Sequence, residues 1–475
     1  MSRAAPSDPV AWQAFLQALQ IRSATAPEPA KSKAQVVVLE LTPAQCRRQA
    51  SLIAAVTEAV AAINDGAVGY VIAPPRWRGR IAASLRRRGV ATGRPNIHLS
   101  SGDARYYVPL TQRSLRFALS TWPQSHRWRH IERLLKYIPG ASIVLREILP
   151  SLGFTSYRAG GEPFGWLGSH ISPSNNREVV VATSWRGADG ATTLFAFEGD
   201  DPTPRLVAKI VPPSRGAALR DEVGNIEQIS PGAGSAGVRV PQLVEYSDAG
   251  DHGSLVLSGI PGRPAQLLLG DNPRALTNVV GQISGWLERW HAASLGHVEL
   301  TAEHCEQRIL APARSLAREL DGRGAYIEWL ANACGQLAGR TVPFVCAHND
   351  LTMSNVLIDE DGGIGIVDWE EARVDGLPLA DFWYSACDAV AAAGHRDRMS
   401  AFAECFPANR ARGELIARHE RELRLAVGGP PDWIELCFHA CWIQHAANEQ
   451  ARPNGDNRPF LAIANRLSEL ALQQT

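Results

Sequence analysis

The residues best placed to do chemistry lie in and just after one short stretch, residues 347–358. This stretch holds a carboxylate, Asp350, and an amide, Asn355, and a second carboxylate, Asp368, ends the apolar run that follows. A carboxylate such as Asp350 can accept the proton of an attacking hydroxyl group. Asn355 and Asp368 offer the hard oxygen ligands that Mg²⁺ prefers, and Mg²⁺ needs few protein ligands beside phosphate and water. These residues are the minimum set for moving a phosphoryl group with magnesium.

The spacing of these residues predicts that the amide and the second carboxylate lie together. Asn355 precedes the apolar run 356–358, and Asp368 ends the apolar run that begins at Ile364. The Asp- and Gly-rich residues 359–363 between the runs are typical of a tight hairpin turn. A hairpin would place both side chains over one metal site, whereas the alternative is a solvated hairpin without function.

The same residues resemble the catalytic loop and metal-binding segment of the kinase-like phosphotransferases, which include aminoglycoside phosphotransferases and choline kinases. The family pattern is His-x-Asp-x-x-x-x-Asn, then a hydrophobic strand ending in Asp-Trp/Phe-Glu, and residues 348–355 and 366–370 match it. Residues 376–383 resemble the Gly-x-Pro-x-x-Asp continuation of that pattern. Asn349 departs from it, because the family usually has Gly there, and this departure concerns loop conformation more than chemistry.

The resemblance implies an α+β fold, the bilobal protein-kinase-like fold with a small β-rich lobe and a large helical lobe. It implies that Asp350 is catalytic and that Asn355 and Asp368 bind Mg²⁺. It also implies supporting roles for His348, which would tie the loop to neighbouring backbone, and for Asp381, which would accept hydrogen bonds from the loop.

Lys209 is the candidate for contacting the nucleotide. It lies inside the apolar run 206–211, where a cation needs a partner or a ligand. In the kinase-like interpretation its ammonium group holds the α- and β-phosphates, and a carboxylate from the next helix positions it. Glu222 is the first candidate for that carboxylate and Glu227 the second. The alternative is an edge-strand lysine that faces water.

The loop that would cover the phosphates has a weak signature. Gly187 and Gly190 lie between the first two strands expected in the small lobe and offer backbone N–H groups. The loop is not Gly-x-Gly-x-x-Gly, so an ordinary hairpin turn is equally open, and residues 174–176 compete for the role. Residues 254–263 resemble the family's hinge, where backbone groups bind the adenine edge, so ATP and GTP are not distinguished.

The elements around these motifs follow from hydrophobic patterning. Residues 179–185, 192–197 and 206–211 are β-rich and predict three antiparallel strands. After Arg263 the chain is mostly helical. An apolar stripe at helical spacing predicts a helix that packs against the catalytic-loop layer. The stripe consists of Val279, Ile283, Trp286, Leu287 and Trp290.

The chain divides into four segments by composition. Short apolar runs alternate with helical patterns before the kinase-like region, which favours a small parallel α/β unit. This unit weakly resembles the later half of a class I methyltransferase fold, but it lacks a Gly-x-Gly loop, so we expect no cofactor there. The expected segments are residues 1–33, an N-terminal helix and linker; 34–150, the α/β domain; 160–263, the kinase-like small lobe; and 264–475, the helical lobe with the catalytic loop.

The composition excludes several classes of function. The 475 residues include 48 Lys and Arg and 48 Asp and Glu, so no global field selects nucleic acid or a membrane surface. No apolar run reaches the ~18 residues that span a bilayer, and the N-terminus lacks a secretory layout. The eight cysteines are scattered, which favours the cytoplasm. Cys437, Cys441 and His445 recur at helical spacing, but their apolar neighbours favour a buried helix over a metal site.

The favoured function is an ATP-dependent O-phosphotransferase that acts on a small-molecule hydroxyl, with GTP as the other candidate donor and Mg²⁺ as cofactor. The acceptor would be an aminoglycoside, a sugar or an amino alcohol. A polycationic aminoglycoside would favour a clear acidic surplus, but the helical segment 388–450 mixes acids with arginines, so a neutral sugar, an amino alcohol or a polyhydroxylated metabolite is equally open. Two alternatives stay open: a catalytically silent, nucleotide-binding regulatory module, and a methyltransferase-related function of the N-terminal domain. The oligomeric state is open.

Overall fold

The structure is a computed structural model, and it forms two compact units. The β-rich unit comprises Met1–Val223 and Gln242–Gly259, and the helical unit comprises Gly224–Pro241 and Ile260–Thr475. None of the helices that the structure describes is long and apolar enough to cross a membrane. The structure describes residues 36–40, 46–47, 53–54, 56–57, 60–61, 68–73, 75–101, 104–109, 111–121, 152–158, 178–184, 191–199, 201, 203–248, 253–270, 273–320, 323–406, 411–451 and 458–473.

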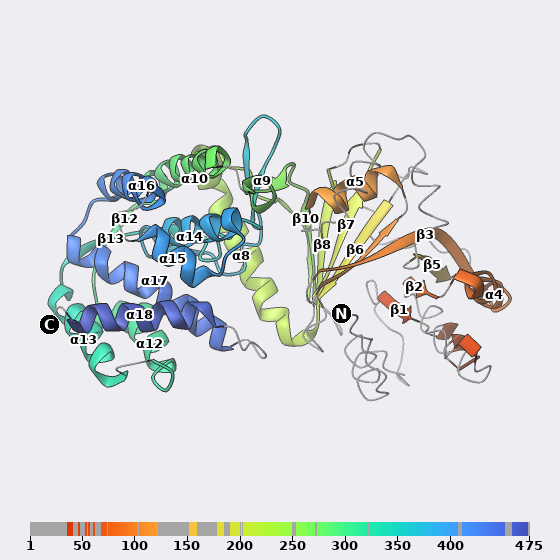
Figure 1. Cartoon of the computed structure of the whole chain (residues 1–475), viewed down its shortest axis with the longest axis horizontal. Helices are drawn as coiled ribbons and strands as arrows, with labels where there is room; N and C mark the ends of the chain where they lie inside the picture. Colours follow the sequence, from red (N-terminus) through yellow and green to blue (C-terminus); the bar gives the residue numbers. More distant parts are fainter. Residues whose placement is uncertain are drawn as a thin grey trace. The chain divides into compact units, whose positions relative to one another are not determined.

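The β-rich unit is built on a ten-stranded sheet (Figure 1). The described part of the unit also contains the helices α4 (Pro75–Arg86) and α5 (Gln112–Thr121), and helix α8 (Gly216–Ala236) begins in it. Across the sheet the strands are β1 (Val36–Glu40), β2 (Val68–Ile72), β5 (Leu152–Arg158), β3 (Val90–Ser101), β4 (Ala104–Pro109), β6 (Glu178–Ser184), β7 (Thr192–Phe197), β8 (Leu206–Val211), β10 (Gly253–Ser258) and β9 (Leu243–Ser247).

The pairing of the strands corrects one expectation. The pair β1 and β2 is parallel, but the other neighbours in the sheet are antiparallel, so the expected parallel α/β unit is wrong beyond its first pair. Strands β3 and β4 show the reason, because the short segment between Ser101 and Ala104 cannot hold the crossover that a parallel connection needs. Strand β4 also pairs with β6, so the N-terminal strands share a sheet with those expected in the small lobe.

The three strands expected in the small lobe are confirmed. Strands β6, β7 and β8 pair antiparallel in that order, and Lys209 lies on β8. Alternate residues are buried along most of β7 and β8, as expected for one face of a sheet on a core, whereas residues 178–181 of β6 are buried in succession, so both faces of β6 are covered there. Helix α5 covers part of this sheet, because Phe117 packs with ring centroids 5.0 Å from Phe195 and 4.9 Å from Phe197.

The helical unit combines two small sheets with a group of helices. One sheet has the order β11 (Arg263–Pro264), β14 (Val356–Ile358), β15 (Ile364–Ile366), and the other has β12 (Gly296–Glu299), β13 (Thr341–Ala347), β16 (Arg373–Gly376). The helices α14, α15, α17 and α18 pack on one another (Figure 1). The helices are α9 (Gln266–Leu269), α10 (Pro273–Ser294), α11 (Ala302–Cys305), α12 (Ala311–Ser315), α13 (Arg323–Leu337), α14 (Ala380–Gly394), α15 (Arg398–Cys405), α16 (Ala411–Val427), α17 (Pro431–Ala451) and α18 (Pro459–Gln473).

The apolar stripe predicted on α10 packs as expected. Trp286 and Trp290 stack with their ring centroids 4.8 Å apart, and Trp290 meets the edge of Trp369 at 5.7 Å. Trp369 directly follows Asp368, so α10 supports the segment that carries the second carboxylate. On α17, Cys437 and Cys441 are buried in the core, as the sequence predicts.

A buried histidine on α17 makes the stability of the helical unit depend on pH. His439 accepts a hydrogen bond at Nδ1 from the Tyr326 hydroxyl over 2.7 Å, and burial lowers the pKa of His439 to about 4. The unfolded chain binds a proton below a pKa of about 6.5. The contribution of this histidine is therefore present above pH 6.5 and is lost as the pH falls toward 4.

We expect His439→Gln to reduce the loss of stability between pH 7 and pH 5. The wild-type histidine accounts for about 2 kcal/mol of that loss, because the unfolded state binds the proton and the folded state excludes it. Urea unfolding followed by tryptophan fluorescence at both pH values measures the difference. The same loss in both proteins would contradict the prediction.

Candidate active site

The hairpin predicted between Asn355 and Asp368 is confirmed. Strands β14 and β15 pair antiparallel, and Asp359 closes the turn by accepting backbone hydrogen bonds at Oδ1 from Asp361 (3.0 Å) and Gly363 (2.6 Å). The Val367 amide donates to the Asn355 carbonyl over 3.1 Å. Because Val367 directly precedes Asp368, residues Asn355 and Asp368 lie at the same end of the hairpin.

The oxygen atoms of Asn355, Asp368 and Glu370 have the chemistry of Mg²⁺ ligands. The Asn355 Nδ2 donates to the Asp350 carbonyl (2.9 Å) and to its Oδ2 (3.2 Å), so the donors of this amide serve the loop and its carbonyl oxygen stays as a ligand. Carboxylate oxygens of Asp368 and Glu370 lie within 4.8 Å of each other. These are hard oxygen donors of the kind that Mg²⁺ binds.

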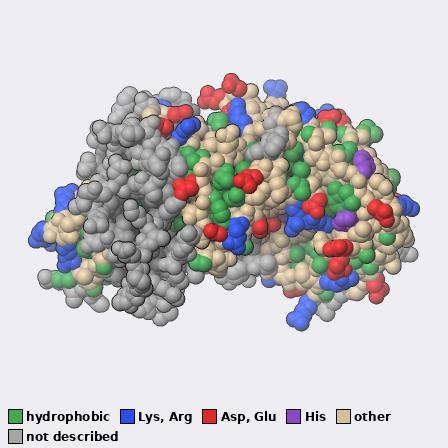
Figure 2. Space-filling model, turned by 180° about the vertical axis from the view of Figure 1, so that it is seen from behind, with side chains coloured by type: hydrophobic (Ala, Val, Ile, Leu, Met, Phe, Trp, Pro, Cys, Tyr) green, Lys and Arg blue, Asp and Glu red, His purple; other side chains and the backbone are tan. Residues whose placement is uncertain are grey.

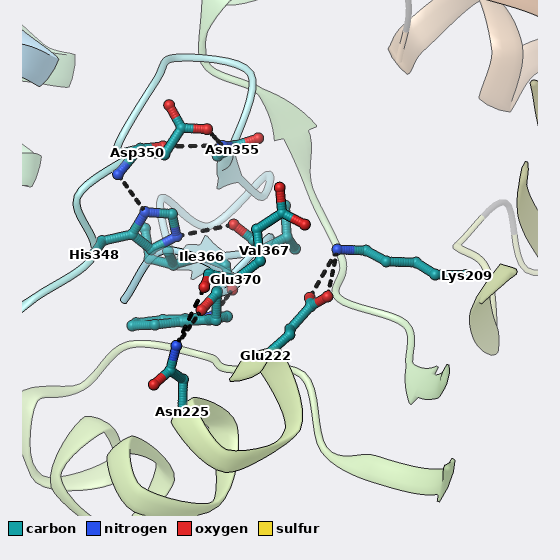
Figure 3. A network of polar contacts seen from close by, with 10 residues as sticks. Lys209, Glu222, Asn225, His348, Asp350, Asn355, Ile366, Val367 and Glu370 are labelled. Carbon is teal, nitrogen blue, oxygen red and sulfur yellow. Dashed lines mark hydrogen bonds and ion pairs between the residues drawn. The ribbon is translucent and has the colours of Figure 1, made fainter. Parts of the chain in front are cut away.

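The backbone around Asp368 is held in a conformation that few residues adopt. Asp368 has a φ of 69°, in the left-handed region where Asp and Asn are tolerated better than most residues. The next residue, Trp369, accepts a hydrogen bond at its carbonyl from the Asn225 side chain over 2.9 Å (Figure 3). The surroundings thus fix the direction in which the Asp368 side chain leaves the backbone.

His348 ties the catalytic loop to the hairpin. It is fully buried, its Nδ1 accepts from the Asp350 amide at 3.3 Å, and its Nε2 contacts the Val367 carbonyl at 3.0 Å (Figure 3). These partners fit a neutral ring that carries its proton on Nε2. The ring also packs on Trp369 with the centroids 4.8 Å apart.

Asp381, the first acid of α14, holds the loop from the other side. Its two carboxylate oxygens accept from the backbone amides of His348 (2.7 Å) and Asn349 (2.8 Å). Burial raises the pKa of Asp381 to about 6, while the two amide donors act in the opposite direction. The carboxyl therefore fixes the backbone just before Asp350.

The backbone conformation of Asn349 explains why asparagine can replace the glycine of the family pattern. Its φ is 61°, a left-handed conformation that suits glycine and that asparagine tolerates better than most other residues. Its Nδ2 donates to the Glu371 carbonyl over 2.9 Å, which further stabilises the turn. The loop conformation is therefore compatible with Asn at this position.

Lys209 and Glu222 form an ion pair within the β-rich unit. The Lys209 Nζ lies 2.7 Å and 2.8 Å from the two carboxylate oxygens of Glu222 (Figure 3). Glu222 is fully buried on α8, whereas Glu227 is exposed. The structure thus pairs Lys209 with Glu222, the first candidate, and not with Glu227, the second. Gly187 and Gly190, and the competing residues 174–176, lie outside the described residues.

Comparison with known protein families shows to which family the region that carries these residues belongs. Residues 187–423 match the model of a phosphotransferase enzyme family. This region belongs to that family. The kinase-like α+β fold, with a β-rich and a helical part, is therefore confirmed, and the chain is a phosphotransferase.

Solved structures with detectable similarity include other phosphotransferases. An aminoglycoside phosphotransferase of Streptomyces rimosus, in complex with ADP and streptomycin, is 17% identical, with 53% of this chain and 90% of that chain covered and a TM-score of 0.37. An aminoglycoside phosphotransferase in complex with GDP and kanamycin is 12% identical, with 65% and 97% covered and a TM-score of 0.38. A putative fructosamine-3-kinase of Haemophilus somnus is 11% identical, with 60% and 88% covered and a TM-score of 0.37. No curated protein matches the sequence.

One polar contact in the phosphotransferase was missed from the sequence. The Tyr384 hydroxyl on α14 donates to Asp350 Oδ1 over 3.2 Å. The available signal is spacing, because Tyr384 follows Asp381 by three residues and therefore shares its helix face. Aromatic residues in a helix usually pack in the core, and Tyr384 is also buried. The pattern alone therefore does not distinguish a tyrosine that packs in the core from one that contacts Asp350.

Proposed function

We propose that the phosphotransferase moves the γ-phosphoryl group of ATP to a hydroxyl group of a small molecule, with GTP as the other candidate donor. The observation that carries the proposal is the catalytic loop, which is held so that Asp350 and Asn355 contact each other beside the hairpin that ends in Asp368. The ion pair of Lys209 with Glu222 supports the nucleotide part of the proposal.

In the proposed reaction Asp350 orients the acceptor hydroxyl and takes its proton as the new bond to phosphorus forms. The bond between the γ-phosphorus and the bridging oxygen of the nucleotide breaks, and the nucleoside diphosphate leaves with that electron pair. Asn355 and Asp368 would hold Mg²⁺, which when bound screens the phosphate charge. Because the transition state is loose, positioning and charge screening contribute more than proton removal.

Lys209 would bind the α- and β-phosphates, and Glu222 would keep its ammonium group in place. A lysine among apolar strand residues is costly without a partner. Glu222 supplies that partner, and the Lys209 side chain is still 18% exposed, which suits a cation that meets a ligand. Glu222 itself touches no phosphate in this proposal and acts through Lys209.

The acceptor class that we propose is a small molecule that carries a hydroxyl group: an aminoglycoside, a sugar or an amino alcohol. The face of the helical unit seen in Figure 2 intersperses acidic and basic side chains, so it provides no single-sign field that would favour a polycationic aminoglycoside over a neutral sugar or an amino alcohol. Kanamycin and streptomycin, which occur in the solved complexes described above, are suitable first probes.

We expect Lys209→Met to raise the KM for the nucleotide about 10- to 100-fold, because a charged hydrogen bond to phosphate is lost. The substitution also leaves Glu222 buried without its cation, which destabilises the fold. The double variant Lys209→Met with Glu222→Gln removes that charge and tests binding separately. Arg205→Met, at an exposed basic residue that directly precedes β8, is the matched control and should keep the wild-type KM. A wild-type KM in the double variant would contradict the role of Lys209.

The proposal as a whole is tested by nucleotide consumption with Mg²⁺. Purified full-length protein is given ATP or GTP and a panel that contains kanamycin, streptomycin, neutral sugars and amino alcohols. Acceptor-dependent consumption supports the proposal. Nucleotide binding without any acceptor-dependent consumption would favour the silent regulatory module, and an absence of nucleotide binding would contradict both functions.

A further inference from the structure

Helix α14 presents three side chains in a row to the catalytic loop. Asp381, Tyr384 and Asp388 are spaced three and four residues apart, so they lie on one helix face. Asp381 accepts from the start of the loop, as described above, and Asp388 Oδ2 accepts from the Met353 amide at its end over 2.8 Å. Tyr384 lies between them in the row and reaches Asp350. The helix face thus contacts the loop on both sides of the proposed base and at the base itself.

The Tyr384 ring is fixed by its neighbours. It is 4% exposed, and it stacks on His445 of α17 with the ring centroids 3.7 Å apart and the planes 13° apart. Phe460 of α18 adds a second aromatic contact at 5.7 Å. A ring packed on two helices has little freedom to turn, so its hydroxyl stays where Asp350 can accept from it.

The hydroxyl of Tyr384 stays protonated. Burial raises the pKa of Tyr384 well above 10, and Asp350 and Asp388 raise it further, while Arg398 acts in the opposite direction. Arg398 is itself paired with Asp388 over 2.9 Å. The phenol is therefore a hydrogen-bond donor at any pH at which the enzyme would work, and it supplies no proton to the reaction.

Both carboxylate oxygens of Asp350 accept a side-chain hydrogen bond. Tyr384 donates to Oδ1 over 3.2 Å and Asn355 donates to Oδ2 over 3.2 Å. Two donors on different oxygens fix the rotation of the carboxylate about its terminal bond, which a single donor leaves free. The direction in which the remaining lone pairs point is then fixed as well.

We propose that Tyr384 is a positioning residue that holds the Asp350 carboxylate in the orientation needed to meet the acceptor hydroxyl. The inference rests on the proposed role of Asp350 as the group that receives the acceptor proton. The proton of the acceptor passes to Asp350, and the proton of Tyr384 stays on its oxygen throughout. A misplaced base costs rate even when substrate binding is intact, because near-attack geometry governs the step.

Tyr384→Phe tests this inference with little disturbance of packing, because phenylalanine keeps the ring between His445 and Phe460. We expect kcat to fall about tenfold while the KM for the nucleotide stays within about twofold, since the lost contact orients the base and touches no phosphate. Tyr326→Phe is the matched control. It also removes a hydrogen-bonded hydroxyl from a fully buried tyrosine of the helical unit, and should keep the wild-type kcat.

The readout is phosphate transfer from Mg·ATP to the panel acceptor with the highest turnover, or to water if hydrolysis exceeds transfer, with thermal unfolding measured on each variant. Asp350→Asn is measured alongside. If Asp350→Asn keeps full activity, the proposed function fails, and the inference with it. If Asp350→Asn is inactive while Tyr384→Phe keeps the wild-type kcat, the inference alone is overturned. A loss in Tyr384→Phe that Tyr326→Phe shares, or that appears in the nucleotide KM, would also overturn it.

Discussion

Asp350→Asn lowers kcat by about 10³-fold and leaves the KM for the nucleotide nearly unchanged. The variant keeps the size of the side chain and an oxygen that can accept from Tyr384, but it cannot take a proton from the acceptor. Because the base acts on the acceptor and not on the phosphates, nucleotide affinity should survive. Steady-state kinetics with the nucleotide and the acceptor varied separately measures both constants.

The control for this prediction is Asp361→Asn. Asp361 is an exposed acid in the turn of the hairpin, and its backbone amide, not its side chain, makes the described contact to Asp359. It should therefore behave as the wild type. A kcat for Asp350→Asn within tenfold of the wild type would show that another group receives the acceptor proton.

Asp368→Asn lowers kcat on the order of 10³-fold at millimolar Mg²⁺. Asparagine tolerates the left-handed φ of 69° about as well as aspartate, so the backbone should keep its shape and the loss should come from the missing charge. An amide oxygen binds Mg²⁺ more weakly than a carboxylate does, so raising the Mg²⁺ concentration should restore part of the activity.

A titration of activity against Mg²⁺ concentration measures this effect. Glu371→Gln is the control, because Glu371 is exposed and its backbone carbonyl, not its side chain, accepts from Asn349. The wild type and Glu371→Gln should share one Mg²⁺ dependence, and Asp368→Asn should be displaced to higher concentration. Identical curves for all three proteins would exclude Asp368 as a metal ligand.

The parts of the site that could be predicted from sequence are those fixed by local spacing. The hairpin between Asn355 and Asp368 needs only two short apolar runs and an Asp- and Gly-rich turn, and both strands form where the pattern places them. The apolar stripe of α10 is equally local, since a period of 3.6 residues defines its buried face. These features depend little on what the rest of the chain does.

Contacts between distant segments were harder to predict. Glu222 and Glu227 are chemically equivalent in the sequence, and the burial of Glu222 against the exposure of Glu227 separates them only in the folded chain. The contact of Tyr384 with Asp350 joins a helix to a loop, and the sequence marks Tyr384 only as an aromatic residue suited to a core. Sheet order is non-local as well, which is why the expected parallel N-terminal unit was wrong beyond its first pair.

Asn349 shows how a local rule and a family pattern combine. The pattern has Gly at this position, and the structure places Asn349 at a φ of 61°, which is the conformation that explains a preference for Gly. Asparagine is among the residues that best tolerate that conformation. The departure was visible in the sequence. Whether asparagine is compatible with the loop conformation depended on a backbone angle that only the structure provides.

The most direct measurement of the central claim is the mass of the acceptor after incubation with the enzyme, Mg²⁺ and ATP. We predict that at least one hydroxylated acceptor of the panel gains the mass of one phosphoryl group, at the rate at which ADP appears. This product should be absent with Asp350→Asn and with Asp368→Asn. ADP formation that releases only free phosphate, at the same rate with and without every acceptor, would contradict the account.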